Sequence, residues 1–311
     1  MNKGLVIKST GSWYHVKNEL GVIIPCKIKG KFRMKGIRTT NPITVGDRVD
    51  FILKEDNNEQ VGLINKIETR KNYIIRKSTN LSKQAHIIAA NIDCAFLVVT
   101  LVQPVTSLAF IDRFLASAEA YRIPCILVFN KVDLYDAEQL NDLESIISIY
   151  DKIGYKCLKT STKTSEGLSG LKDMMQNQIS VFSGHSGVGK STLVNHIEPG
   201  LKLKTNIISA YHEAGQHTTT FSEMFNLSFG GYIIDTPGIK GFGVLEMDKY
   251  EISHYFPEIF KQSVECQFNN CTHTHEPNCA VKQAVYEGEV AESRYVTYLS
   301  LVEGEDEKYR S

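Results

Sequence analysis

The chain has 311 residues, of which 42% are hydrophobic and 23% charged, and its formal net charge is zero. These values are typical of a folded globular protein with two or three domains. No apolar run approaches the roughly 18 residues of a membrane-spanning helix, and the polar start Met1-Asn2-Lys3 is not that of a signal peptide. Seven cysteines without a secretory signal indicate a reducing compartment, so we expect a cytoplasmic protein without a membrane anchor.

The charge is divided unevenly along the chain. Residues 1–77 hold 16 Lys/Arg but only 7 Asp/Glu, a net charge of +9, so the remainder carries −9. Short β-rich segments between turn signals fill this basic part, at residues 5–7, 13–16, 22–24, 47–52 and 62–67. Five strands in about 70 residues predict an all-β barrel of the OB type.

Residues 27–38, between the third and fourth predicted strands, form a loop that is dense in cations and carries Phe32. A loop that combines positive charge with an aromatic ring suits nucleic-acid binding, and OB folds commonly bind oligonucleotides. The alternative is a solvated loop on a barrel that only connects domains. The barrel context favours RNA.

From about residue 85 the pattern changes to alternating strands and helices. Continuous apolar, β-rich segments predict strands at 94–100, 126–129, 156–159, 179–182 and 232–234. Helical periodicity predicts helices over 108–121, through 143–149, over 168–177 and from 190 to 196. This alternation predicts an α/β domain with a parallel sheet, in which ligands bind beyond the carboxyl ends of the strands.

Asn130-Lys131-Val132-Asp133 directly follows the strand at 126–129. A carboxylate can accept two hydrogen bonds from the N–H groups on the edge of guanine, so we expect Asp133 to bind the base. Lys131 should lie across the purine face, and Asn130 should tie the base loop to the phosphate loop. Ser161 and Thr162 follow the strand at 156–159, where a second loop would contact the base oxygen.

A glycine-rich phosphate loop follows the strand at 179–182 and comprises Gly184, His185, Ser186, Gly187, Val188, Gly189, Lys190, Ser191 and Thr192. Its glycines let the backbone approach phosphate, and Lys190 should neutralise the β- and γ-phosphates. Ser191 and Asp235 should hold Mg²⁺. Asp235 opens the run Asp235-Thr236-Pro237-Gly238, in which Gly238 can present its N–H to the γ-phosphate.

The base-reading motif precedes the phosphate loop, which is the reverse of the order in an ordinary GTPase. The sequence therefore predicts a circularly permuted P-loop fold. Its new chain ends lie after Gly238 and before the strand at 94–100, beside the nucleotide-sensing segments. Loss of γ-phosphate contacts should consequently affect both flanking modules.

Residues 215–220 lie between the phosphate loop and Asp235 and contain the threonines expected of a switch. Thr219 is our choice of Mg²⁺ ligand, with Thr218 as the alternative. Ile239 stands where Ras-type enzymes have the Gln that orients the attacking water. His217 is the nearest catalytic candidate to replace it, unless His217 only holds the switch by a hydrogen bond.

Cys266, Cys271, His273 and Cys279 are spaced C-x4-C-x-H-x5-C near the C-terminus. Three thiolates and an imidazole are typical of a closed structural zinc site, so we expect one Zn²⁺ per chain, with His275 as a rival ligand. Residues 250–260 and 280–301 read as helices around this cluster. We therefore expect three domains, over residues 1–77, 78–243 and 244–311.

The combination of a barrel, permuted GTPase motifs and a C-x4-C-x-H-x5-C cluster resembles the RsgA (YjeQ) family. The resemblance implies a cytoplasmic GTPase that converts GTP to GDP and phosphate, binds ribosomal RNA and acts late in assembly of the small ribosomal subunit, which stimulates it. The family's switch usually reads Gly-Arg-His-Thr-Thr, whereas this chain has Gln216 in place of the Arg. We expect a monomer.

The sequence argues against two other classes of function, a metabolic enzyme and an RNA-binding protein with a vestigial nucleotide site. A metabolic enzyme that acts on guanine nucleotides would also need residues to bind and activate an acceptor substrate, and the sequence contains no further set of catalytic residues for that purpose. An RNA-binding protein with a vestigial nucleotide site should lack Lys190 or Asp133, and both are present. A nucleotide-switched RNA-binding protein whose hydrolysis is incidental remains the alternative.

Overall fold

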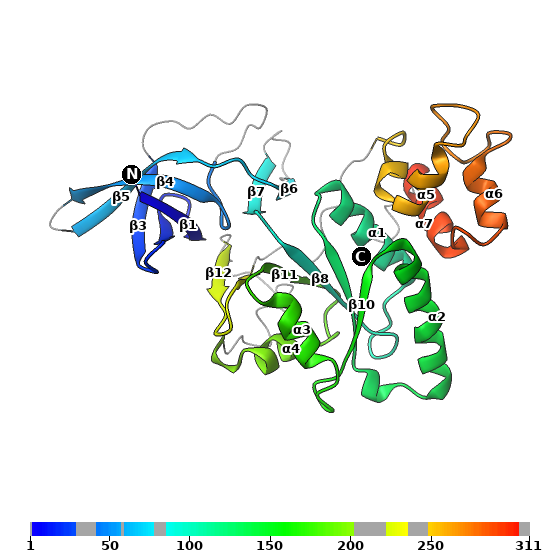
Figure 1. Cartoon of the computed structure of the whole chain (residues 1–311), viewed down its shortest axis with the longest axis horizontal. Helices are drawn as coiled ribbons and strands as arrows, with labels where there is room; N and C mark the ends of the chain where they lie inside the picture. Colours follow the sequence, from blue (N-terminus) through cyan, green and yellow to red (C-terminus); the bar gives the residue numbers. More distant parts are fainter. Residues whose placement is uncertain are drawn as a thin grey trace, which may run out of the picture.

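A computed structural model of the chain describes residues 2–28, 42–56, 59–77, 85–201, 222–235 and 248–304. Along its longest axis lie a β-barrel, a central α/β layer structure and a helical module, in that order (Figure 1). Within these described ranges, no helix is long and apolar enough to cross a membrane.

The basic N-terminal part is a closed barrel, and all five predicted strands are present in it. They are β1 (Asn2–Ser9), β2 (Tyr14–Asn18), β3 (Ile23–Ile28), β4 (Arg48–Asp56) and β5 (Glu59–Ile67). The strands pair in the order β1-β2-β3-β5-β4, and β4 returns to pair with β1. Alternating side chains such as Val6, Val16 and Phe51 fill the interior, as the period of a strand requires.

The central sheet has the order β10-β9-β8-β11-β13-β12. The five predicted strands are confirmed as β8 (Cys94–Val99), β9 (Cys125–Asn130), β10 (Lys156–Thr160), β11 (Ile179–Ser183) and β13 (Tyr232–Asp235), and they run parallel. A sixth strand, β12 (Glu223–Asn226), was not predicted; it is short and pairs antiparallel with β13. The chain enters this sheet at β8 and leaves it at β13, on either side of β11, which is the arrangement of a permuted fold.

Helices cover both faces of this sheet. One face packs against α1 (Leu108–Ala120) and α2 (Ala137–Ile153), and the other against α3 (Leu168–Met175) and α4 (Lys190–Ile197). The side chain of Ser107 caps α1, and Asp136 with Gln139 forms a capping box at the start of α2. The short 3-10 helices η1 (Val132–Leu134) and η2 (Pro199–Leu201) follow β9 and α4.

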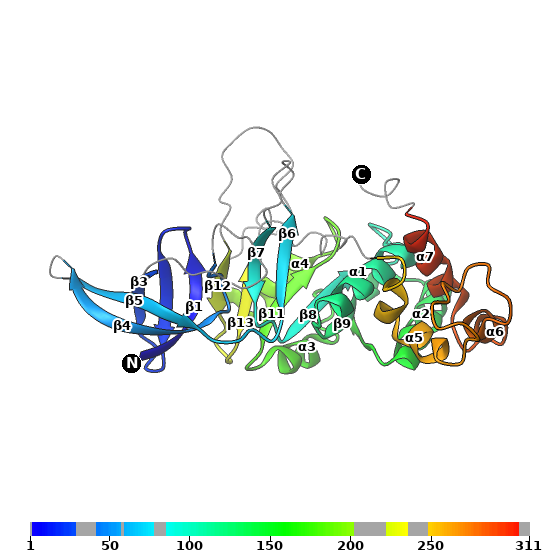
Figure 2. The same cartoon turned by 90° about the horizontal axis from the view of Figure 1, so that it is seen from above.

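Two features join the barrel to the central sheet. A hairpin of β6 (Tyr73–Lys77) and β7 (Ala85–Ala90), which the sequence analysis did not expect, lies across the predicted boundary at residue 77. In addition, β1 pairs with β12 at Lys8 and Glu223, whose side chains form an ion pair at 3.0 Å. Figure 2 shows β12 beside β1 at this junction.

The C-terminal module comprises η3 (Ile252–Tyr255), α5 (Pro257–Ser263), α6 (Ala280–Tyr286) and α7 (Glu292–Val302). Our expectation of continuous helices over 250–260 and 280–301 was wrong. Pro257 disfavours helical backbone at the preceding residue, and Phe256 is extended, with φ −119° and ψ 91°. The second helix is interrupted after Tyr286 because Gly288 adopts φ +76°, which ends α6.

Candidate functional site

The base-reading loop and the phosphate loop meet at the carboxyl edge of the parallel sheet. Asn130 ends β9, Thr160 ends β10, and the phosphate loop follows β11. Asn130 Nδ2 donates to the Val188 carbonyl at 2.8 Å, while Thr160 Oγ1 donates to Asn130 Oδ1 at 3.0 Å. Asn130 therefore connects the two loops, and Thr160, which sequence reasoning missed, fixes the direction of its amide.

The two loops approach so closely that only glycine fits at position 189. Gly189 adopts φ +98°, and a Cβ built on it would lie 2.4 Å from Asn130 Nδ2. A side chain at this position would therefore break the contact between the loops as well as strain the backbone.

Lys190 is held inside the phosphate loop. Its ammonium donates to the carbonyls of Gly184 at 2.8 Å and His185 at 2.6 Å, and the residue is only 5% exposed. Lys190 and Ser191 also lie in the first turn of α4, where the backbone N–H groups have no acceptor within the helix. A cation beside a helix N-terminus is suited to bind phosphate.

Ser161 orients the carboxylate of Asp133. Its Oγ donates to Asp133 Oδ1 at 2.5 Å and accepts the backbone N–H groups of Lys163 and Thr164 at 3.1 and 3.2 Å. The sequence places Ser161 in a loop that would contact the base oxygen; its hydroxyl holds Asp133, and contact of this loop with the base stays a prediction. Thr162, the other residue expected there, is half-buried.

The segment after β8 borders the same site, although no motif marks it. Lys131 has left-handed backbone, with φ +63°, and its ammonium donates to the Gln103 carbonyl at 2.7 Å. The hydroxyl of Tyr135 accepts the Leu101 N–H at 2.8 Å and donates to the Asn130 carbonyl at 3.1 Å. In each contact one partner is a backbone group, which any residue type supplies, so the sequence did not indicate these contacts.

His185 in the phosphate loop stacks on Phe110 of α1, with ring centroids 3.9 Å apart and planes inclined by 32°. Partial burial and the nearby Lys190 ammonium lower the pKa of His185, which favours its neutral form. No motif or spacing indicates that Phe110, 75 positions earlier, contacts this loop.

The predicted Mg²⁺ ligands are described only in part. Ser191 is buried at the start of α4, and Asp235 is the last residue of β13, although its side chain is outside the described set. Gln216, His217, Thr218, Thr219, Gly238 and Ile239 also lie outside the described residues, as does the basic loop over 29–38. Magnesium coordination and the catalytic role of His217 therefore stay predictions.

The four predicted metal ligands come together in the C-terminal module. The ligand atoms of Cys266, Cys271, His273 and Cys279 all lie within 4.8 Å of one another. His273 Nδ1 is 3.6 Å from Cys266 Sγ and 3.4 Å from Cys279 Sγ, and these two sulfurs are 3.9 Å apart. Tetrahedral zinc, with bonds of about 2.3 Å to sulfur and 2.0 Å to nitrogen, separates neighbouring ligand atoms by about 3.5–3.8 Å. The cluster therefore fits a metal ion of this kind.

The surrounding hydrogen bonds select His273 rather than His275. His273 is buried, and Tyr295 donates to its carbonyl at 2.5 Å, whereas His275 is exposed. Burial lowers the pKa of His273 and so favours the neutral imidazole that a metal needs, while burial raises the pKa of Cys271 to about 12. A bound cation would favour the ionised thiolates.

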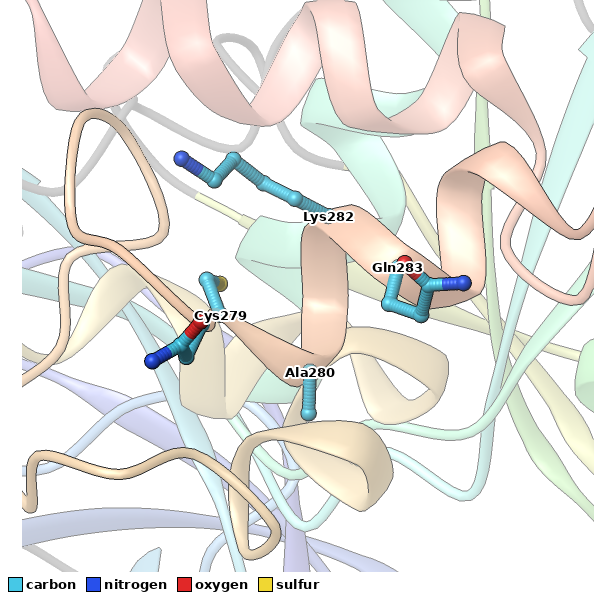
Figure 3. Close-up of a pocket in the computed structure, with 5 residues that line it drawn as sticks. Cys279, Ala280, Lys282 and Gln283 are labelled. Atoms are coloured by element: carbon cyan, nitrogen blue, oxygen red, sulfur yellow. The ribbon is translucent and has the colours of Figure 1, made fainter.

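An open surface pocket of about 500 Å³ lies beside Cys279 and is lined by Asn278, Cys279, Ala280, Lys282 and Gln283 (Figure 3). It lies at the start of α6, in the C-terminal module, whereas the phosphate loop precedes α4 in the central domain (Figure 1). This pocket is therefore separate from the nucleotide site.

Two protein families match the chain. The family described as RsgA GTPase matches residues 67–245, and the RsgA N-terminal domain matches residues 3–64. The chain is 59% identical over 310 residues to "Small ribosomal subunit biogenesis GTPase RsgA" of Bacteroides fragilis, covering 99% of both chains. It is 57% identical over 308 residues to the protein of that name in Flavobacterium johnsoniae, covering 99% of this chain and 95% of that one.

Solved structures agree with these matches. The crystal structure of YjeQ from Thermotoga maritima has a TM-score of 0.79 and 37% identity, covering 97% of this chain and 98% of that one. The structure of YloQ, described as a circularly permuted GTPase, has a TM-score of 0.74 and 30% identity, covering 99% of this chain and 96% of that one. The chain is similar to both over nearly its whole length.

Proposed function

The chain belongs to the RsgA family of GTPases, and on that premise we propose that it hydrolyses GTP to GDP and phosphate during biogenesis of the small ribosomal subunit. Its partners are GTP, GDP, the small subunit and the ribosomal RNA of that subunit. The names of its relatives support the ribosomal partner, and the motifs support the nucleotide.

The hydrogen bond from Asn130 to the Val188 carbonyl carries the nucleotide part of the proposal. It joins a loop with the chemistry to read guanine to a loop with the chemistry to hold phosphates, at the edge where a parallel sheet binds ligands. One molecule that contains both groups, a guanine nucleotide, can satisfy both loops. Neither loop alone would distinguish GTP from other ligands.

The proposed roles follow from the chemistry of the residues. Asp133 pairs with guanine, Lys190 neutralises the β- and γ-phosphates, and the N–H of Gly238 meets the γ-phosphate. Mg²⁺ enters with GTP and is held by Ser191, Asp235 and Thr219. Asp133, Lys190 and Ser191 lie in the described part of the chain, and the position of Lys190 and Ser191 at the start of α4 supports their assignment.

We propose that the free protein hydrolyses GTP slowly and that the small subunit stimulates it. Ile239 cannot orient the attacking water, so His217 takes this role once a partner orders the switch. The +9 charge of residues 1–77 suits binding to ribosomal RNA.

The metal of the Cys266 cluster is proposed to be a single structural zinc ion, because three thiolates and one imidazole leave no open position for chemistry. A protein that acts on assembling subunits is expected in the cytoplasm, and we propose that it works as a monomer.

The test is steady-state GTP hydrolysis against a titration of purified small subunits, with large subunits as the control. We expect a low rate for the free protein and a saturable rise with small subunits only. Stimulation by neither subunit would overturn the ribosomal proposal. GTP-dependent binding to the subunit without turnover would instead favour a nucleotide-switched RNA-binding protein. His217→Ala tests the catalytic residue, because full stimulation of that variant would reject its role.

A further inference from the structure

The contact between Phe110 and His185 joins the phosphate loop to the first turn of α1. Phe110 is the third residue of the helix, and its N–H is fixed by Ser107, whose carbonyl and Oγ accept it at 3.1 and 3.2 Å. The ring is half-buried against the core on the α1 face of the sheet. Phe110 therefore presents a fixed aromatic surface to an otherwise exposed histidine.

The backbone of His185 in turn positions the phosphate-binding lysine. The carbonyl of His185 accepts a hydrogen bond from Lys190 Nζ at 2.6 Å, the shorter of the two carbonyl contacts of that ammonium. A shift of His185 away from Phe110 would move this carbonyl and the ammonium that it holds.

The next turn of α1 forms hydrogen bonds with α7 of the C-terminal module. Asp112 is fully buried, and it accepts hydrogen bonds from Arg294 at 3.1 Å and Thr297 at 2.9 Å, both on α7. Arg113 donates to Ser300 Oγ of α7 at 3.1 Å. The helix that holds the phosphate loop is thus itself held by the metal-binding module (Figure 1).

We propose that Phe110 is a positioning residue for the phosphate loop and that the C-terminal module keeps it in place through α1. This inference rests on the proposed function, since it assigns a role in holding GTP phosphates. It makes the C-terminal module part of the apparatus that binds nucleotide, without contact between that module and the nucleotide.

The first test replaces the ring while keeping an apolar side chain. Phe110→Leu should raise the dissociation constants of GTP and GDP about 2- to 10-fold, the size expected for an aromatic pair. GMP, which has no β-phosphate for Lys190, should bind unchanged. Phe110→Tyr, which keeps the aromatic ring, should bind GTP and GDP as tightly as the wild type. In Phe110→Leu the pKa of His185, measured by NMR, should rise towards its ordinary value.

Phe229→Leu is the matched control, because Phe229 is also half-buried but packs against the core on the opposite face and lies under Lys172. Equal nucleotide affinities of wild type, Phe110→Leu and Phe229→Leu would overturn the proposal. An equal loss for GMP would overturn it as well, since that loss would mean general damage. If the wild type binds no guanine nucleotide, the proposed function fails before this comparison begins.

The second test is a double-mutant cycle across α1. Thr297→Val removes one hydrogen bond to Asp112 and preserves side-chain shape, so it should weaken GDP binding by about 2-fold or more in the wild type. It should have no effect in Phe110→Leu, where the connection is already broken. Additive effects, or no effect of Thr297→Val in either background, would overturn transmission through α1.

Discussion

The carboxylate of Asp133 is held in one direction before any base arrives. Ser161 donates to one of its oxygens, and two backbone N–H groups fix Ser161 in turn. A carboxylate that is already oriented loses little freedom when it binds its ligand, which favours affinity. Specificity for guanine at this site should therefore depend on Asp133 directly and on Ser161 through it.

Asp133→Asn should weaken GTP binding about 10- to 100-fold, the loss expected for hydrogen bonds to a charged group, and favour xanthosine nucleotides. The amide of Asn presents a donor where guanine also presents one. Dissociation constants for GTP and XTP, measured by titration calorimetry, check this shift. Asp142→Asn, an exposed change on α2, serves as the control, and unchanged selectivity in Asp133→Asn would refute base reading by this residue.

Ser161→Ala should reduce GTP affinity less than Asp133→Asn, by about 3- to 10-fold, because Asp133 remains but is no longer oriented. It should also lower the stability of the loop, since the Lys163 and Thr164 amides lose their acceptor. Ser145→Ala removes a serine hydroxyl from the exposed face of α2 and is the matched control. An affinity loss as large as that of Asp133→Asn would point to direct contact between Ser161 and the base.

Among the elements, α1 and α7 share the most deeply buried charges of the described chain. The Arg294 and Asp112 side chains are both 0% exposed, and Arg294 also pairs with Glu258 of α5 at 2.7 Å. Ala116 of α1 belongs to the same hydrophobic cluster as Phe256, Ile259 and Tyr298. The C-terminal module is consequently packed onto the GTPase domain by both a charge network and an apolar core.

Arg294→Ala should reduce the free energy of unfolding by about 3–5 kcal/mol, because it leaves Asp112 and Glu258 buried without their cation. Urea unfolding measures this change. Lys3→Ala, which removes the exposed pair with Glu68, should change the free energy of unfolding far less, because water and salt screen an exposed pair. Equal effects of the two substitutions would show that the buried network does not hold the module.

Removal of the metal should destabilise the same module. Elemental analysis of protein purified without chelator should give one zinc per chain, and Cys271→Ser or His273→Ala should lose it and lower the melting temperature. His275→Ala should retain both the zinc and the stability, because His275 is exposed and outside the cluster. Loss of zinc in His275→Ala with retention in His273→Ala would reverse our choice of ligand.

Across the whole molecule, the net positive charge belongs to residues 1–77, most of which form the barrel at one end of the longest axis (Figure 2). The chain is neutral as a whole, so long-range attraction to RNA must come from this end rather than from net charge. The barrel also contacts the strand that follows the switch residues, through the Lys8–Glu223 pair on β1 and β12. A short ladder thus connects the barrel, where we propose that RNA binds, to the nucleotide domain.

Binding to the small subunit should weaken steeply with salt, because phosphate contacts release counterions. Neutralising Lys29, Lys31, Arg33 and Lys35 together should reduce subunit affinity and make the log–log salt slope shallower by about 3. GTP affinity of the free protein should not change. The control variant neutralises Lys152, Lys156, Lys249 and Lys261, which are exposed outside the barrel, and an equal effect of this control would refute a specific role for the basic loop.

The chemistry of the nucleotide site and of the metal cluster could be predicted from the amino-acid sequence. Asn130, Asp133, Lys190 and the Cys266 cluster are recognisable because phosphate, guanine and zinc each demand particular residue types at short spacing. The reversed order of the motifs indicated the permutation, and continuous apolar, β-rich segments indicated the strands that precede them. Each of these motifs lies within a short stretch of the chain, so it can be recognised without knowledge of the fold.

The contacts between these parts became apparent only in the folded chain. Burial supports His273, the ligand predicted from the spacing, over its rival His275. The role of Ser161 depends on a hydroxyl that bonds Asp133, 28 positions earlier in the chain. The stacking of Phe110 on His185 and the pairing of Asp112 with Arg294 join residues 75 and 182 positions apart. Contacts of this kind leave no periodicity or spacing in the sequence, because they arise when separate elements pack together in the folded chain.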